Sequence, residues 1–447
     1  METITRRQYL KLSARTAALS LLSLKTLAQS PKKPNIIFII ADDMGWNDIG
    51  YQNPDIITPN INRLAESGVR FTHHYATPTC TPTRVAIMSG RYPSRFGVYS
   101  PAYGQIFSDD TVTLPKALQK AGYFTAISGK WHMGSPPEYT PLRYGFDSSY
   151  GYFHGQVDPY THYYKNGEDS WHRNDKPLKE EGHATDLITN EAIRVIEEQK
   201  DNPFFLYVAY SVPHYPLSEP EKWTSLYNNM ENESRRWNCA SISHMDHGIG
   251  QIVEAVDRAG IRKNTVIIFL SDNGGQRSWR SNTEYGGDYA DKPHEVLGDN
   301  EPLRGWKGQV YEGGIRVPGL INWHGTLQPG EMNTPIHVAD WMPTLCTIAN
   351  YQPQQDLNWD GQSMWNVISS DVSTPPQRVM YWNTGSMQAV RQGDMKLVVS
   401  DRGKTVELFN PAADPLEQKD LAPEQPEKVK ELQAILNDLI RDDNSEK

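Results

Sequence analysis

Residues 35–43 read Asn35-Ile36-Ile37-Phe38-Ile39-Ile40-Ala41-Asp42-Asp43. The first seven are almost wholly apolar and do not alternate with polar residues, which is typical of a parallel strand buried on both faces. The two aspartates come at the carboxyl end of that strand, where open α/β sheets place their binding sites. This stretch therefore predicts both the fold class and the edge of the sheet at which a site should lie.

Three further runs of the same kind occur at residues 124–128, 204–210 and 265–271. Helical patterns lie between them, such as residues 185–199, in which Thr185 can cap the first turn and the apolar residues share one face. Alternating strands and helices predict an α/β fold with a large, mostly parallel wound sheet flanked by helices.

The sequence changes character near residue 373. Short strand patterns at 380–383, 387–400 and 406–409 predict a short antiparallel sheet, and a helical apolar face runs from Val429 to Leu439. We therefore expect a catalytic domain over residues 33–372 and a smaller C-terminal α+β subdomain over residues 373–447.

The N-terminus carries the pair Arg6-Arg7, followed by a weakly apolar run through Leu27. This pattern predicts a twin-arginine-like export signal over residues 1–30 and a periplasmic or secreted location. The run is too short and too polar to span a membrane.

The formal net charge of -10 disfavours nucleic acid as a partner.

The chain contains three cysteines, Cys80, Cys239 and Cys346. At most one disulfide can form, so at least one thiol is left over. Pro82 is favoured in a first helical turn, which places Cys80 at a helix N-terminus, where free backbone N–H groups favour an anion. A buried, inert thiol is the alternative reading.

Asp42-Asp43 and Asp272-Asn273 each follow a predicted buried strand. Either pair alone could simply form a turn. If the two strands are neighbours, four oxygen-bearing side chains converge, and such ligands favour a hard cation such as calcium or magnesium. Basic residues also follow strand ends or lie in loops, and their shared location favours an anion site: Lys130, His132, His214 and Lys307.

These residues carry a family resemblance. Cys80-Thr81-Pro82-Thr83-Arg84 fits the C-x-P-x-R signature of the formylglycine-dependent (type I) sulfatases, and the chain resembles that family over nearly its whole mature length. The supporting blocks are residues 41–48, 89–93, 129–134, 271–275 and 312–316. Within the family, residues 46–48 and 303–307 most resemble arylsulfatase B, an N-acetylgalactosamine 4-sulfatase.

The resemblance implies an alkaline-phosphatase-like fold and the hydrolysis of sulfuric esters. It implies that a maturation enzyme oxidises Cys80 to formylglycine, whose hydrate is the nucleophile. It also implies one calcium ion, bound by Asp42, Asp43, Asp272, Asn273 and the modified residue 80. Arg84 and Lys130 would hold the hydrate with His132 beside it, and His214 and Lys307 would contact sulfate and the leaving oxygen.

The chemistry suits these groups. One hydroxyl of the hydrate would attack sulfur while His214, assisted by Lys307, protonates the departing alcohol. His132 would then take a proton from the second hydroxyl, and sulfate would be expelled.

The aromatic-rich segment 150–172 and the residues Arg277, Trp279 and Arg280 favour a sulfated polysaccharide or oligosaccharide as substrate, although aromatic packing on the core explains the segment equally well. Two alternatives remain open. One is a phosphoester or phosphonate hydrolase on the same fold. The other is a non-catalytic protein that binds sulfated glycans and keeps an unmodified Cys80.

Overall fold

The fold is built on β1 (Asn35–Asp42), which is buried along its whole length. In the computed structural model, which describes residues 33–135, 138–165, 167–278, 285, 297–370 and 378–445, β1 lies between two parallel neighbours, β10 (Phe204–Pro213) and β11 (Thr265–Ser271). β4 (Phe124–Lys130) and β5 (Ser148–Tyr152) continue the parallel core beyond β10. The four predicted strands are confirmed.

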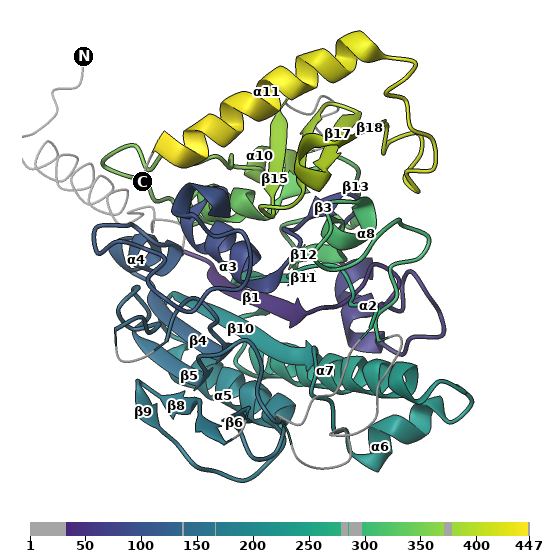
Figure 1. The fold of residues 1–447 in the computed structure, drawn as a ribbon. Coiled ribbons are helices and arrows are strands. Elements are labelled where there is room, and N and C mark those ends of the chain that lie inside the picture. The colour runs from purple at the N-terminus through teal and green to yellow at the C-terminus, as the bar shows by residue number, and fades with distance from the viewer. Residues whose placement is uncertain are drawn as a thin grey trace, which may run out of the picture. The chain divides into compact units, whose positions relative to one another are not determined.

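The sheet becomes antiparallel at both margins. β12 (Gly319–Trp323) is antiparallel to β11 on one side, and β8 (Trp171–Arg173) is antiparallel to β5 on the other. Over the described residues the strand order is β13-β2-β12-β11-β1-β10-β4-β5-β8-β9. The predicted mostly parallel sheet is therefore a mixed sheet with a parallel centre (Figure 1). The remaining strands of the sheet are β2 (Val69–Phe71), β9 (Lys176–Pro177) and β13 (Gly330–Met332).

Helices cover both faces of the sheet because the side chains of β1 alternate between them. Ile37 and Ile39 belong to one hydrophobic cluster, and Ile36, Phe38 and Ile40 to another. The first cluster includes α2 (Pro59–Glu66), α5 (Ala184–Gln199) and α7 (Glu233–Arg258), and the second includes α3 (Cys80–Ser89), α4 (Leu114–Lys120) and α9 (Trp341–Ile348).

The start of α5 differs from the prediction. The helix is capped by His183, whose Nδ1 accepts a hydrogen bond from the backbone N–H of Thr185 at 3.2 Å, so Thr185 lies in the first turn rather than at the cap. The short elements are α6 (Glu221–Thr224), α8 (Glu312–Ile315), α10 (Trp365–Ser369), the 3-10 turns Pro93–Phe96, Ser225–Tyr227, Arg262–Asn264, Val338–Asp340 and Asp401–Gly403, and the strand pairs β3 (His74–Tyr75) with β14 (Ile336–His337) and β6 (Tyr163–Tyr164) with β7 (Glu168–Asp169).

The predicted C-terminal sheet is confirmed as four antiparallel strands, β15 (Val379–Asn383), β16 (Gln388–Gln392), β17 (Met395–Ser400) and β18 (Thr405–Phe409). One face packs against α11 (Pro426–Ser445), and the other packs against Tyr75, Val310 and Ile315 of the larger part. The proposed boundary near residue 373 lies outside the described residues, and the division into two domains stays a prediction.

The predicted export signal, residues 1–30, also lies outside the described residues. Among the helices that the structure describes, none combines the length and the apolar character needed to cross a membrane. All three cysteines are buried and free, so Cys239 and Cys346 do not pair.

Candidate active site

The two acidic pairs meet at the carboxyl edge of the sheet because β1 and β11 are adjacent, with Ala41 opposite Ser271. The backbone N–H of Asp43 donates to Asp272 Oδ1 at 3.1 Å, and Asn273 Nδ2 donates to Asp43 Oδ1 at 2.8 Å. Asp43 has a φ of 70°, a strained conformation for a residue other than glycine. The tertiary structure therefore brings together four of the five predicted metal ligands, and Cys80 is the fifth.

Cys80 is the first residue of α3 and is 2% exposed. Its Sγ and one carboxylate oxygen each of Asp42 and Asp272 lie within 4.8 Å of one another. Burial raises the pKa of the Cys80 thiol, although Lys130 and Lys307 oppose the rise. The unmodified side chain is therefore a neutral thiol and a poor nucleophile at neutral pH.

Three cations neutralise the buried carboxylates. Lys130 Nζ lies 2.6 Å from Asp42 Oδ2, Arg84 Nη2 lies 2.8 Å from Asp272 Oδ2, and Lys307 Nζ lies 2.7 Å from Asp43 Oδ2. Arg84 also donates to the backbone carbonyl of Lys130 at 3.1 Å, which ties α3 to the end of β4. Three carboxylates face three cations, so a bound divalent cation would leave the cluster positive and ready for an anion.

The pKa values of Asp42 and Asp43 shift in opposite directions. Burial and the Asp272 carboxylate raise the pKa of Asp42 to about 8, although it is paired with Lys130. Burial would also raise the pKa of Asp43, but the charge and hydrogen bond of Lys307 and the hydrogen bond from Asn273 outweigh it and lower that pKa to about 2. The repulsion among the carboxylates is thus only partly relieved by the protein's own cations.

The donor set fits a hard cation. Asp42 Oδ1 and Asn273 Oδ1 are buried and have no hydrogen-bond partner among the described residues. An orphaned buried oxygen is costly, and a cation in contact with both oxygens would satisfy them. Carboxylate and amide oxygens are the ligands that calcium and magnesium prefer.

Two histidines flank the cluster. His132 follows β4, has a φ of 55°, and both of its ring nitrogens are buried with no hydrogen-bond partner among the described residues. His214 follows β10; its Nδ1 lies 2.6 Å from the Tyr215 carbonyl, and its Nε2 lies 3.7 Å from Asp43 Oδ2. Because a carbonyl only accepts, Nδ1 of His214 carries a proton, and Nε2 is the nitrogen directed at the cluster.

Both imidazoles are neutral at pH 7. Burial, then the charge of Lys307, lowers the pKa of His214 to about 3. Burial, then Lys130 and Arg84, lowers the pKa of His132 well below its ordinary value. Burial alone would lower the pKa of Lys307, but the Asp43 carboxylate outweighs burial and raises this pKa above its ordinary value. Lys307 therefore keeps its proton.

A cavity of about 480 Å³ opens onto four of the predicted residues, Cys80, His132, His214 and Lys307. Arg84 and Lys130 are fully buried behind it. The structure therefore brings every predicted site residue to one place. The sequence did not single out several other lining residues, because they lie in loops without a motif: Pro101, Tyr103, Gly155, Gln156, Lys165, Tyr215, Gln276 and Ser278. Trp306, of the 303–307 block, also lines the cavity.

The aromatic segment 150–172 contributes mostly to the core. Tyr150, Tyr152 and Trp171 are at most 3% exposed and pack on one another, as the packing alternative predicted. Of this segment's aromatic side chains, Tyr164 lines the cavity, where it stacks on His154 with ring centroids 4.2 Å apart. Arg277 also lines the cavity, whereas Trp279 and Arg280 lie outside the described residues.

Comparisons with known proteins agree with this geometry. A family model described as Sulfatase matches residues 34–351. Arylsulfatase J of Mus musculus is 30% identical over 467 residues, covering 90% of this chain and 74% of the mouse protein. N-acetylgalactosamine-6-sulfatase of Homo sapiens is 32% identical over 397 residues, covering 82% of this chain and 72% of the human protein.

Among solved structures, Ps i-CgsB superposes with a TM-score of 0.84 and 30% identity, covering 92% of this chain and 94% of that one. The same protein in complex with k-i-k-neocarrahexaose gives a TM-score of 0.83 and 29% identity over the same shares of the two chains. These relatives support the type I family and the predicted fold class, but they do not support a particular likeness to arylsulfatase B.

Proposed function

Because this chain belongs to the sulfatase family and is a sulfuric ester hydrolase, we propose that it removes sulfate from a sulfated polysaccharide or oligosaccharide. The observation that carries the proposal is the convergence of Cys80, Asp42 and Asp272 within 4.8 Å beside the cavity. The likeness to Ps i-CgsB, which has been solved with k-i-k-neocarrahexaose, favours a sulfated galactan as the first substrate to test.

The nucleophile is proposed to be formylglycine formed from Cys80 by a maturation enzyme. The buried thiol with its raised pKa supports this, because it would attack a sulfate ester poorly. Formylglycine supplies a hydrated aldehyde, in which one hydroxyl can attack sulfur and the other can lose its proton to expel sulfate.

One calcium ion is proposed to be held by Asp42, Asp43, Asp272, Asn273 and residue 80. The orphaned oxygens Asp42 Oδ1 and Asn273 Oδ1 support this assignment. The ion would supply positive charge against the sulfate oxygens.

The chain's own side chains divide the remaining work. Lys130 binds the Asp42 carboxylate, and Arg84 binds the Asp272 carboxylate. Arg84 also joins α3 to the end of β4 through the backbone carbonyl of Lys130. Lys307, bound to Asp43 at the cavity wall, is placed to neutralise the ester. Because the proton of neutral His214 is on Nδ1, Nε2 must first take a proton, for which the Lys307 ammonium is the source, before it passes that proton to the leaving oxygen. His132 lines the cavity with residue 80, and its unpaired nitrogens suit the base that removes the second proton.

Export to the periplasm or the medium is proposed on the twin-arginine-like N-terminus. A polysaccharide is too large for ready uptake, so an exported enzyme would meet such a substrate where it occurs.

The test combines two measurements. Purified protein from a host with a maturation enzyme is assayed for sulfate release from carrageenan oligosaccharides and 4-nitrophenyl sulfate, with 4-nitrophenyl phosphate as the comparison. Mass spectrometry of the peptide that contains residue 80 reports whether the cysteine has become an aldehyde. Release of sulfate with formylglycine present supports the proposal. Preferred cleavage of phosphate would favour the phosphoester alternative, and sulfate release with an unmodified cysteine would contradict the proposed nucleophile.

A further inference from the structure

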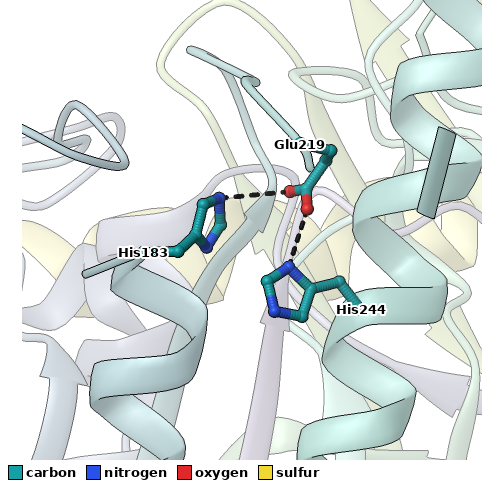
Figure 2. A group of neighbouring side chains, drawn as sticks. All are labelled: His183, Glu219 and His244. Carbon is teal, nitrogen blue, oxygen red and sulfur yellow. Dashed lines mark hydrogen bonds and ion pairs between the residues drawn. The ribbon is translucent and has the colours of Figure 1, made fainter. Parts of the chain in front are cut away.

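A second buried cluster lies away from the carboxylate site. Figure 2 shows His183, which precedes α5, Glu219, in the loop after β10, and His244 of α7 pointing at one another. His244 Nδ1 lies 2.7 Å from Glu219 Oε2, and His183 Nε2 lies 3.6 Å from Glu219 Oε1. The side chains of His244 and Glu219 are fully buried.

The hydrogen bonds of this cluster favour an ion pair between Glu219 and His244 over a metal site. His183 Nδ1 accepts from the backbone N–H of Thr185, so the proton of a neutral His183 is on Nε2. That nitrogen faces the Ser218 carbonyl at 3.2 Å. A metal ion at this position would need a lone pair on His183 Nε2, but that nitrogen carries the proton.

His244 is held as a cation. Its Nδ1 faces Glu219, and its Nε2 lies 3.0 Å from Asp186 Oδ1. Because carboxylates only accept hydrogen bonds, both ring nitrogens must donate, which requires the imidazolium. Burial lowers the pKa of His244, but the hydrogen bonds that its ring donates to Asp186 and Glu219 outweigh it and raise that pKa to about 9.

The surroundings of His244 contain few other charges among the described residues. Trp223 stacks on its ring with centroids 5.0 Å apart, and the same indole contacts His247 and lies under the Nζ of Lys222. The ring of His183 lies 4.7 Å away. Among the described residues, Glu219, Asp186 and His183 are the titratable groups in contact with His244, and Lys222, His247 and Tyr160 lie next to this cluster.

The cluster is connected to the cavity by a short stretch of chain. His214 and Tyr215 line the cavity, and Leu217, two residues later, is fully buried in the core. The backbone carbonyl of Ser218 accepts from His183, and the next residue, Glu219, binds His244. The far end of the loop is therefore anchored to α5 and α7 by these contacts.

We propose that His244 is a positioning residue for the sulfatase reaction: by holding Glu219 it fixes the loop that presents His214 and Tyr215 to the cavity. The inference rests on the proposed role of His214. A displacement of about 1 Å in a group near the reacting atoms can cost about a hundredfold in rate, so loosening this anchor should lower kcat more than it raises KM.

The test uses the full chain with Glu219→Gln, which keeps the shape of the side chain and removes its charge. Amide hydrogen exchange at pH 7 is followed in peptides covering residues 211–220. We expect exchange at 214–219 to become roughly tenfold faster or more, with β1 and β10 unchanged, and kcat for sulfate release to fall about 10–100-fold.

The matched control is Asp186→Asn, which removes the other carboxylate on His244 but leaves the loop residue in place. At pH 7 we expect Asp186→Asn to exchange residues 214–219 at the wild-type rate. At pH 9 we expect Asp186→Asn to exchange them faster than the wild type does at the same pH, because its His244 loses the proton at a lower pH. Hydrogen exchange is measured without substrate. If the wild type does not cleave the chosen saccharides, the proposed substrate is wrong, but the exchange measurement still tests the role of His244.

Three results would overturn the proposal. The first is unchanged exchange at 214–219 in Glu219→Gln. The second is uniformly faster exchange over the whole chain, which would mark a purely structural role. The third is a stoichiometric transition metal in the wild type that disappears in His244→Gln, which would make the cluster a metal site.

Discussion

Lys396 Nζ donates to Glu312 Oε1 at 2.9 Å, and both side chains are fully buried. Lys396 lies on β17 of the C-terminal sheet, whereas Glu312 begins α8, five residues after Lys307. A second carboxylate, Glu417, accepts from Lys396 at 2.8 Å and from the backbone N–H of Glu312 at 2.7 Å. The C-terminal sheet therefore holds the segment that carries Lys307, a lysine of the candidate active site.

Replacing Lys396 by methionine should destabilise the whole protein. Lys396→Met leaves Glu312 and Glu417 buried without their nearest cation, and breaking such a pair typically costs about 3–5 kcal/mol. Denaturant unfolding measures the loss. The control is Lys419→Met, because Lys419 pairs with Glu424 at the surface, where both side chains are more than half exposed and the pair contributes little. Equal stability of the two variants would show that the buried pair does not hold the sheet in place.

Removal of calcium should lower both activity and stability. Asp42 Oδ1 and Asn273 Oδ1 lose their partner when the ion leaves, and an ion present at 100 times its dissociation constant stabilises the folded state by about 2.7 kcal/mol. Chelation followed by thermal unfolding and sulfate-release assays, with and without added calcium, measures both effects. In Asp272→Asn the calcium-dependent shift in Tm should shrink or vanish. A wild type with the same Tm and activity in chelator as in calcium has no functional ion at this site.

The stability of the fold should fall between pH 6.5 and pH 9.5. The pKa of His244 rises from 6.5 in the unfolded chain to about 9 in the folded one. A raised pKa means that the folded state binds the proton more tightly, so the stabilisation is full below pH 6.5 and is lost as pH rises through 9. The contribution is on the order of 3 kcal/mol. Denaturant unfolding at both pH values should show that His244→Gln loses less stability over this interval than the wild type; parallel losses would contradict the assignment.

The central strands were predictable, whereas the margins of the sheet were not. Residues 35–41 and 265–271 are long apolar runs, and a strand buried on both faces needs such a run. β8 and β9 are three and two residues long, too short for any periodicity to reveal. The acidic pairs could be placed at strand ends, but only the pairing of β1 with β11 brings them together, and that long-range pairing is a tertiary property.

The candidate site residues were easier to single out from the sequence than the walls of the cavity. Cys80 and the two acidic pairs lie in recognisable local patterns, whereas the direction of an aromatic side chain depends on strand register. Tyr152 and Tyr164 illustrate this, since the first is buried in β5 and the second lines the cavity. The Glu219–His244 contact has no local signal, because its two residues meet only when a loop docks on a helix.

Loss of His214 should depend on the leaving group. If His214 protonates the departing oxygen, His214→Gln should lower kcat/KM for a sugar sulfate by about 10²–10⁴. For 4-nitrophenyl sulfate the loss should be much smaller, because nitrophenolate departs without a proton. His324→Gln, an exposed histidine outside the cavity, is the matched control and should leave both rates unchanged. Equal losses on both esters would assign His214 to binding rather than to proton transfer.

Cys80→Ser, left unmodified, should abolish multiple turnover. Serine offers one hydroxyl, so even if it accepts sulfate it has no second hydroxyl from which the ester can collapse, and no more than one equivalent of product per enzyme can form. A pre-steady-state assay with 4-nitrophenyl sulfate counts that equivalent, and intact-protein mass spectrometry detects any trapped sulfate. Cys239→Ser is the matched control, because Cys239 is an equally buried free cysteine on α7 and should retain turnover. Continued turnover by unmodified Cys80→Ser would rule out a mechanism that needs two hydroxyls on residue 80.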